Sequence, residues 1–219
     1  MPHPYRAAII TVSDSVAQGT RQDLSGPAVR RLLEAADWTV KSSEAVPDDF
    51  SLIRERLGAL AADIEVDVVF TTGGTGVGPR DRTPEATTSV MERSLPGLAE
   101  LMRREGLKKT PLAALSRAVV GVKGKALLVN LPGQPQGVED SLKAILDILP
   151  HAVDVVRGEA IHPAPSREGL ALEVSAVEAE PIPASESSEA SVEEASATAS
   201  ELQDESAPEQ EGLGKPEPV

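Results

Sequence analysis

Short apolar runs alternate with segments of helical periodicity over the first 160 residues, and this alternation constrains the fold more than any other feature. Two of the runs, RAAIITV at Arg6–Val12 and VDVVFT at residues 66–71, are apolar and β-branched almost throughout. Such runs are typical of parallel strands that are buried on both faces of a sheet. A third run, Thr39–Val46, predicts another strand between them.

Signals for helix starts follow these runs. The triplet Ser25-Gly26-Pro27 places a proline in a first helical turn. Asp49 is the predicted N-cap of the next helix, and Thr83 is predicted to cap another, with Pro84 at its first position. A further helix is expected at residues 97–105. The helix after Asp49 repeats its apolar residues at helical spacing, at Leu52, Ile53, Leu57 and Leu60.

The segment from residue 117 to residue 157 completes the pattern. RAVVGVKGKALLVNL predicts two strands joined by a turn at KG, LPGQPQ predicts a loop, and residues 137–157 are predicted to be helical with a break near Pro150. Strands that alternate with helices define the α/β class. We predict a three-layer αβα sandwich with a mostly parallel sheet, in one domain of residues 1–163.

Polar loops follow each of the predicted parallel strands. They lie at residues 13–15 (SDS), 47–49 (PDD), 72–81 (TGGTGVGPRD) and 131–136 (LPGQPQ). In open α/β sheets, ligands bind outside the carboxyl ends of the strands. If the strands are parallel, all four loops open on the same edge of the sheet, and we expect the functional site there.

The loop at residues 72–81 is the strongest candidate for an anion site. Its four glycines carry no Cβ, so a ligand can approach the backbone, and the helix start that follows favours negative charge. Arg80 can add a bidentate contact to a phosphate. The loop matches neither the Rossmann pattern, which needs a third glycine at a fixed position, nor the Walker pattern, which ends in Gly-Lys-Ser/Thr. The alternative is a tight strand-to-helix turn without a ligand.

A carboxylate beside a phosphate is repulsive unless a cation lies between them. Asp81 ends the glycine loop, and Asp48 follows the neighbouring strand. Two carboxylates that face bound phosphates suggest Mg²⁺, which proteins hold with one or two carboxylates plus phosphate oxygens. The alternatives are that Asp81 is a helix-start residue and that Asp48 is a turn residue.

Five motifs in this order resemble a known family. They are VSDS after the first strand, VPDD after the second, TTGGTG…PRDRTPEAT after the third, LSR at residues 115–117 and NLPGQP at residues 130–135. Together they resemble the molybdopterin adenylyltransferases of the Mog/MoaB type, over residues 6–157. The resemblance implies transfer of AMP from Mg-ATP to the terminal phosphate of molybdopterin, with release of pyrophosphate.

The resemblance also implies roles for residues. Asp48 and Asp81 match the two acids that the family requires, and they are predicted to be catalytic and to hold Mg²⁺. The resemblance further implies a homotrimer or hexamer and a downstream molybdenum-inserting protein. The predicted substrate-binding residues are Ser13, Asp14, Thr72, Gly73, Gly74, Thr75, Gly76, Arg80, Ser116, Pro132, Gly133 and Gln134.

Two other functions stay open at this point. A molybdopterin-binding carrier or regulatory domain without catalysis would keep the glycine loop, but it has less need of two acids for a cation bridge. A nucleotide-binding protein for another substrate is the third reading. A net charge of −14 and an aromatic content of 2% argue against nucleic-acid binding.

The charge is concentrated near the C-terminus. Residues 164–219 carry 14 acidic and 2 basic side chains, whereas residues 1–163 carry 21 and 19. From about residue 181 the sequence is rich in Glu, Ser, Ala and Pro, so residues 164–219 are predicted to be a disordered tail, with a marginal strand at residues 164–180. The tail is either a solvating extension or a partner-binding segment.

The remaining composition bears on the compartment. The chain has no cysteine, which excludes disulfides and thiolate zinc sites. It shows no signal peptide and no apolar run of the roughly 18 residues that span a membrane. We therefore expect a cytoplasmic protein.

Removal of residues 164–219 is expected to leave both the melting temperature and the activity unchanged, because this segment is too poor in apolar side chains to pack on the domain. Thermal unfolding and an activity assay of the truncated and full-length chains check this. A large loss of either quantity would show that the tail is part of the folded unit.

Overall fold

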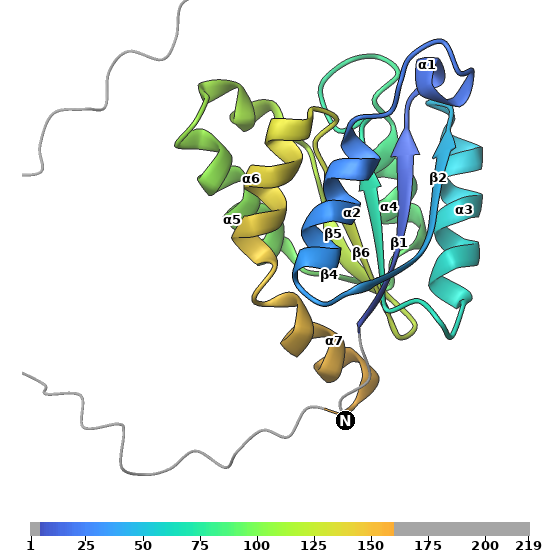
Figure 1. Cartoon of the computed structure of the whole chain (residues 1–219), viewed down its shortest axis with the longest axis vertical. Coiled ribbons are helices and arrows are strands. Elements are labelled where there is room, and N and C mark those ends of the chain that lie inside the picture. Colours follow the sequence, from blue (N-terminus) through green and yellow to red (C-terminus); the bar gives the residue numbers. More distant parts are fainter. Residues whose placement is uncertain (1–4, 160–219) are drawn as a thin grey trace, which may run out of the picture. The chain divides into compact units, whose positions relative to one another are not determined.

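The computed structural model describes residues 5–159, which contain one six-stranded sheet of order β2-β1-β3-β6-β5-β4 (Figure 1). Strands β1, β2, β3 and β6 run parallel, and β5 is antiparallel to both of its neighbours. The predicted mostly parallel sheet and the predicted hairpin are thus confirmed. The strands are β1 (Arg6–Val12), β2 (Thr39–Val46), β3 (Val68–Thr72), β4 (Arg93–Ser94), β5 (Val120–Lys123) and β6 (Ala126–Leu131).

Helices cover both faces of the sheet, so the three-layer αβα prediction is confirmed (Figure 1). Helices α2, α5, α6 and α7 pack on one face, and α3 and α4 pack on the other. The helices are α1 (Asp14–Ala17), α2 (Ser25–Ala35), α3 (Phe50–Ala62), α4 (Thr83–Val90), α5 (Pro96–Leu107), α6 (Pro135–Ile145) and α7 (Leu149–Arg157), with a 3₁₀ helix η1 at Pro111–Leu115.

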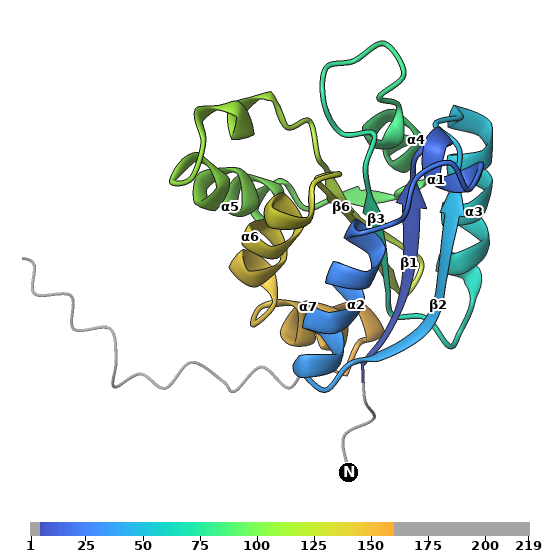
Figure 2. The ribbon, with the colours of Figure 1, turned by 45° about the horizontal axis from the view of Figure 1, so that its top comes forward.

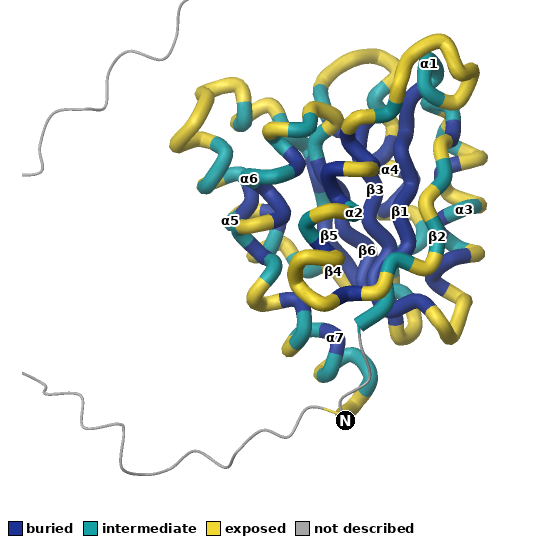
Figure 3. The backbone as a smooth tube through the Cα atoms, in the orientation of Figure 1, coloured by how far each residue is buried: buried dark blue, intermediate teal, exposed yellow. Residues whose placement is uncertain are grey.

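The central strands bury both of their faces (Figure 3). Along β1, Ala7 and Ile9 belong to one core cluster, while Ala8 and Ile10 belong to the other. Both clusters are built almost entirely from aliphatic side chains, and Phe70 is the largest of the fully buried residues. This two-sided burial explains why the sequences of β1 and β3 are continuously apolar and not alternating.

The structure corrects the predicted start of α4. The helix begins at Thr83, with Arg82 at the N-cap position and Pro84 second. The Thr83 hydroxyl donates to the carbonyl oxygen of Gly73 at 2.9 Å, so it stabilises the glycine loop and does not cap the helix. Asp49, in contrast, caps α3 as predicted, and its carboxylate accepts from the backbone N–H of Leu52 at 2.9 Å.

The predicted helix at residues 137–157 is two helices. A turn at residues 146–148 separates them, close to the predicted break, and the Ile148 N–H donates to the Ile145 carbonyl oxygen at 2.9 Å. Pro150 lies in the first turn of α7, where a missing N–H costs nothing. Helix α6 also starts earlier than predicted, at Pro135, so the predicted loop ends before it. The short elements α1, β4 and η1 carry no pattern that the sequence prediction detected.

The order of the sheet creates a gap at the carboxyl ends of β1 and β3. From β1 the chain crosses to β2 on one side and then returns past β1 to β3 on the other. Helices α2 and α3 therefore lie on opposite faces, and the chain continues from β1 to a helix on one face and from β3 to α4 on the other. This is the topological switch point at which α/β folds bind ligands.

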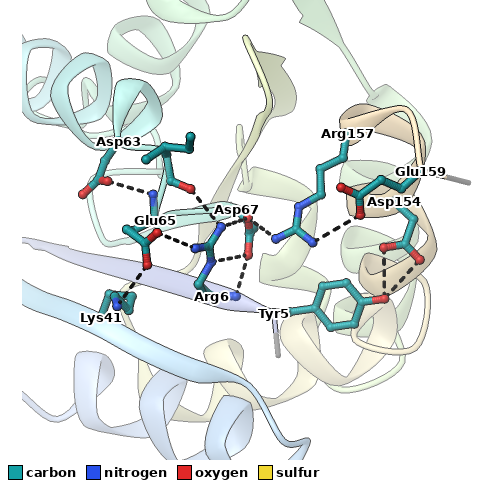
Figure 4. A network of polar contacts seen from close by, with 10 residues as sticks. Tyr5, Arg6, Lys41, Asp63, Glu65, Asp67, Asp154, Arg157 and Glu159 are labelled. Carbon is teal, nitrogen blue, oxygen red and sulfur yellow. Dashed lines mark hydrogen bonds and ion pairs between the residues drawn. The ribbon is translucent and has the colours of Figure 1, made fainter. Parts of the chain in front are cut away.

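A polar network ties the opposite edge of the sheet together (Figure 4). Asp67, whose side chain is 4% exposed, pairs with Arg6 at 3.1 Å and with Arg157 of α7. It also accepts from the backbone N–H of Arg6 at 2.8 Å. The Tyr5 hydroxyl donates to Asp154 at 3.1 Å. The network holds α7 against the first residues of β1.

Two opposing effects set the pKa of Asp67. Burial raises the pKa of this carboxyl group, but hydrogen bonds and charge from Arg6 and Arg157 offset that effect and hold the pKa below its usual range. A depressed pKa in the folded state means that the stabilisation is present above the pKa of the unfolded chain, about 3.9. It is lost as the pH falls through the folded-state value.

Within the described residues, no helix is both long and apolar enough to cross a bilayer. The predicted tail at residues 164–219, its marginal strand and the predicted domain boundary at residue 163 all lie outside the described residues.

Replacing Asp67 with asparagine is expected to lower the free energy of unfolding at pH 7 by about 3 kcal/mol, because two arginines lose a buried counter-charge. Urea unfolding measures the change. The difference from wild type should begin to shrink below about pH 4, where the carboxyl group of the unfolded chain becomes protonated, and it should vanish as the pH falls through the lower folded-state pKa.

Glu65→Gln is the matched control for Asp67→Asn. Glu65 also pairs with Arg6, but its side chain is 54% exposed, so solvent screens the pair and its loss should cost far less than that of Asp67. Equal losses for the two variants would show that burial of Asp67 does not matter.

Candidate active site at the carboxyl edge of the sheet

Hydroxyl groups at the end of β3 and at the start of α2 bind the main chain of the loop after β6. The Thr72 hydroxyl donates to the carbonyl oxygen of Pro132 at 2.6 Å, and Ser25, at the start of α2, donates to that of Gly133 at 2.7 Å. Gly133 lies so near Gly73 that a Cβ added to it would be 3.2 Å from the Gly73 Cα. The predicted convergence of the strand-end loops is thus seen in the structure.

The first two glycines of the loop have positive φ angles, 103° for Gly73 and 62° for Gly74. A Cβ on Gly73 would lie 2.2 Å from the carbonyl oxygen of Val12, the last residue of β1. One on Gly74 would lie 2.4 Å from the Thr83 hydroxyl. Both positions therefore require glycine for conformation and for space. Where the loop begins, directly after β3, its main chain packs tightly against Val12 and Thr83.

Asp14 and Asp48 hold each other across the ends of β1 and β2. The Asp14 N–H donates to Asp48 Oδ2 at 2.9 Å, and the Asp48 N–H donates to Asp14 Oδ1 at 3.1 Å. Arg80 crosses from the glycine loop and donates to Asp14 Oδ1 at 2.9 Å and to the Asp48 carbonyl at 3.2 Å. Asp48 Oδ1 faces the loop, 3.4 Å from where a Cβ on Gly74 would lie.

Asp81 lies folded against its own loop. Its Oδ2 accepts from the Gly78 N–H at 2.7 Å. Added Cβ atoms on Gly76 and Gly78 would come within 2.9 and 2.8 Å of the same oxygen. These two glycines thus leave the space that the carboxylate occupies. The loop projects beyond the end of β3 before it turns into α4 (Figure 2).

A pocket of about 520 Å³, here called the central pocket, opens between the ends of β1, β3 and β6. The lining residues that sequence reasoning missed include Arg21, Asp23 and Ser25. The predicted residues that line it are Ser13, Asp48, Thr72, Gly73, Gly74, Gly133 and Gln134.

Two of the missed residues, Asp23 and Arg21, set the distribution of charge in the central pocket. Asp23 accepts from the N–H groups of Ser25 and Gly26, both at 3.0 Å, so it already occupies the N-terminus of α2. An anion therefore has no place there. Arg21 donates to the Ser13 hydroxyl at 3.2 Å and brings a positive charge to the wall. Neither residue belongs to a pattern that the sequence alone could distinguish from an ordinary polar loop.

A second pocket, here called the lateral pocket, has a volume of about 250 Å³ and lies beside α5 and α6. Ser116 lines this pocket and not the central one, and Pro132 lines it as well. Gln134 lines both pockets, so the loop at residues 131–136 forms the wall between them. Eight of the predicted substrate residues are therefore distributed over two adjoining spaces, whereas Asp14, Thr75, Gly76 and Arg80 line neither pocket.

The predicted Mg²⁺ would need ligands other than protein side chains. Among residues 5–159 there is no group of three or more His, Cys, Asp or Glu placed to hold a metal ion. Asp48 and Asp81 border the glycine loop from opposite ends, at Gly74 and at Gly76 with Gly78. Two such carboxylates fit Mg²⁺ only when phosphate oxygens complete its shell, which is the usual mode for this ion.

Comparisons with known proteins agree with this architecture. The model of a family described as "Probable molybdopterin binding domain" matches residues 8–151. Molybdopterin adenylyltransferases from Helicobacter pylori (strain J99) and Escherichia coli (strain K12) are 38% and 33% identical over 154 and 174 residues. These alignments span 68% and 73% of this chain, and 86% and 89% of the relatives.

Solved structures of related proteins have the same fold as this chain. The molybdopterin biosynthesis enzyme MoaB of Thermus thermophilus is 49% identical and superposes with a TM-score of 0.67. The match covers 70% of this chain and 97% of that one.

Fold and site define an α/β domain with a glycine-rich loop and two carboxylates at its topological switch point. The chain belongs to the molybdopterin-binding domain family. The resemblance to molybdopterin adenylyltransferases of the Mog/MoaB type, predicted from the five motifs, is confirmed.

Gly73→Ala is expected to lower the melting temperature by several degrees, because alanine adds both a strained positive φ and a clash with the Val12 carbonyl. Gly58→Ala is the control. Gly58 lies inside α3 with no atom near its added Cβ, so alanine there should raise the stability by up to about 1 kcal/mol. Thermal unfolding compares the two, and an unaffected Gly73→Ala variant would contradict the observed loop geometry.

Proposed function

We propose that the protein transfers AMP from Mg-ATP to the terminal phosphate of molybdopterin, giving adenylyl-molybdopterin and pyrophosphate. It is an enzyme of molybdenum cofactor biosynthesis, a nucleotidyltransferase, as its curated relatives are named. One observation carries the assignment within this chain: Asp48 and Asp81 border the same glycine loop from its two ends. A loop that only bound an anion would gain nothing from two flanking carboxylates.

The reaction joins two polyanions. A phosphate oxygen of molybdopterin attacks the α-phosphorus of ATP, a new O–P bond forms, and the bond to the bridging oxygen breaks as pyrophosphate leaves. The attacking phosphate is already ionised at neutral pH, so no strong base is required. Orientation of the reactants and neutralisation of their charge therefore account for most of the catalysis.

The residues divide this work. In the proposal, Mg²⁺ bound with ATP supplies positive charge to the phosphates, and Asp48 and Asp81 hold it. The exposed N–H groups of the glycine loop bind the molybdopterin phosphate. Arg80 pairs with Asp14 in this structure, so a phosphate contact from Arg80 requires exchange of that partner.

The two pockets give room for the two substrates on either side of one wall. Ser13, Thr72 and Gly133 line the central pocket, Asp14 supports its lining residue Asp48, and Ser116 lines the lateral pocket. Gln134 reaches both. We propose that both pockets belong to one substrate site, since the glycine loop and the loop at residues 131–136 touch at Gly73 and Gly133.

The setting of the reaction follows from the same proposal. The product is an activated intermediate, so a downstream molybdenum-inserting protein must accept it. We further propose a homotrimer or hexamer that works in the cytoplasm.

Asp81→Asn is expected to lower kcat by about 10²- to 10³-fold while the KM for molybdopterin stays within about threefold of wild type. Asparagine can still accept from the Gly78 N–H, so the loop keeps its shape, but the charge that holds the cation is gone. The measurement is formation of adenylyl-molybdopterin from molybdopterin, ATP and Mg²⁺.

Asp147→Asn is the control for this prediction, because Asp147 is exposed in the turn between α6 and α7 and lines neither pocket. It should leave both constants unchanged. If the wild type binds molybdopterin but forms no adenylylated product, the chain is a carrier or regulatory domain and the enzymatic proposal fails.

A further inference from the structure

Arg117 contacts the glycine loop both at its middle and at its last residue. Its backbone N–H donates to the carbonyl oxygen of Thr75 at 2.9 Å, and its Nε donates to that of Gly76 at 2.6 Å. Its Nη2 donates to the carbonyl oxygen of Asp81 at 2.6 Å. One arginine, 36 residues further along the chain than Asp81, thus closes the segment from Gly76 to Asp81.

These contacts decide which groups of the loop remain for a ligand. A carbonyl oxygen that points at a phosphate is repulsive, and Arg117 binds the carbonyl oxygens of Thr75, Gly76 and Asp81. Charge-assisted hydrogen bonds of this kind are roughly twice as strong as neutral ones. The loop is glycine-rich and loses much conformational entropy on ordering, so such an external brace matters more here than in an ordinary turn.

Arg117 does not have a free edge for a substrate phosphate. Its remaining nitrogen, Nη1, pairs with the carboxylate of Glu85 in the first turn of α4. A direct contact to a phosphate would require one of these partners to be released. Glu85 also balances the arginine charge, so the net charge that this cluster presents to the substrates is that of Asp81.

We infer that Arg117 is a positioning residue for adenylyl transfer, which acts by fixing the main chain of Asp81 and so the direction of its carboxylate. This inference rests on the proposed function. Asp81 is held at three points: Arg117 binds its carbonyl oxygen, the Gly78 N–H binds its carboxylate, and the Gly78 carbonyl oxygen accepts from its N–H at 3.0 Å. Loss of the first contact leaves the carboxylate attached only to the loop that is itself released.

Arg117→Lys tests the inference by steady-state kinetics at varied Mg²⁺. Lysine keeps the positive charge but has a single donor group, which cannot reach both Gly76 and Asp81 in a fixed geometry. The expected result is a decrease of about 10²-fold in kcat, the typical effect of a displacement near 1 Å. The Mg²⁺ concentration at half-maximal rate should rise, and the KM for molybdopterin should stay within about threefold.

A double-mutant cycle identifies the residue through which Arg117 acts. If Arg117 works through Asp81, the double variant Asp81→Asn/Arg117→Lys should lose no more activity than Asp81→Asn alone. Multiplied losses in the double variant would overturn the inference. So would a rise in the KM for molybdopterin at constant kcat, which would mean that Arg117 contacts the substrate.

Arg56→Lys is the matched control. Arg56 also forms a bidentate pair with a carboxylate, that of Glu44 at 2.9 Å, but it lies on α3 and lines neither pocket. This variant should keep the wild-type Mg²⁺ dependence. If both lysine variants shift it equally, the effect in Arg117→Lys is a general loss of stability.

Amide hydrogen exchange separates this inference from the proposed function. In Arg117→Lys, exchange at residues 74–82 should accelerate, while exchange in β1 and β3 should match wild type. If the wild type forms no product, the proposed function fails, and exchange at residues 74–82 still shows whether Arg117 holds the loop. Unchanged exchange there would overturn the inference even in an active enzyme.

Discussion

The site depends on one backbone contact, the approach of Gly73 to the carbonyl oxygen of Val12. A side chain at position 73 would come within 2.2 Å of that oxygen, so only glycine lets the ends of β1 and β3 stay adjacent as the chain turns. Gly133, in the loop after β6, also packs against Gly73. Three strand ends therefore meet through main-chain atoms, and side chains are left to line the pockets on both sides of the contact.

The two acids of the site are supported by different means. Asp48 follows β2, and its two hydrogen bonds with Asp14 attach it to the end of β1. The sheet therefore holds Asp48 in place. Asp81 belongs to a loop whose shape comes from Gly78 and Arg117. A catalyst that orients two anions needs both carboxylates held in place, and here the sheet holds one while loop contacts hold the other.

The sequence predicted the parts of this protein whose cause is local. Continuous apolar runs predicted β1 and β3, and four glycines before an acid predicted the loop, because burial and backbone freedom leave direct traces. Strand order leaves none. Arg117 was missed because its partners lie about 40 positions away, and Thr83 was predicted as a cap because its hydroxyl gives no sign that it binds Gly73. The split of the substrate residues over two pockets depends on how α5 and α6 pack, which is also non-local.

The Tyr5–Asp154 hydrogen bond has a consequence for engineering. It places the first and last helical or extended segments of the described domain side by side, at the edge of the sheet away from the glycine loop. Domains whose ends adjoin tolerate relocation of their termini. A circular permutation that joins these two segments through a short linker would therefore change the order of the elements along the chain. The arrangement of the pockets would stay the same.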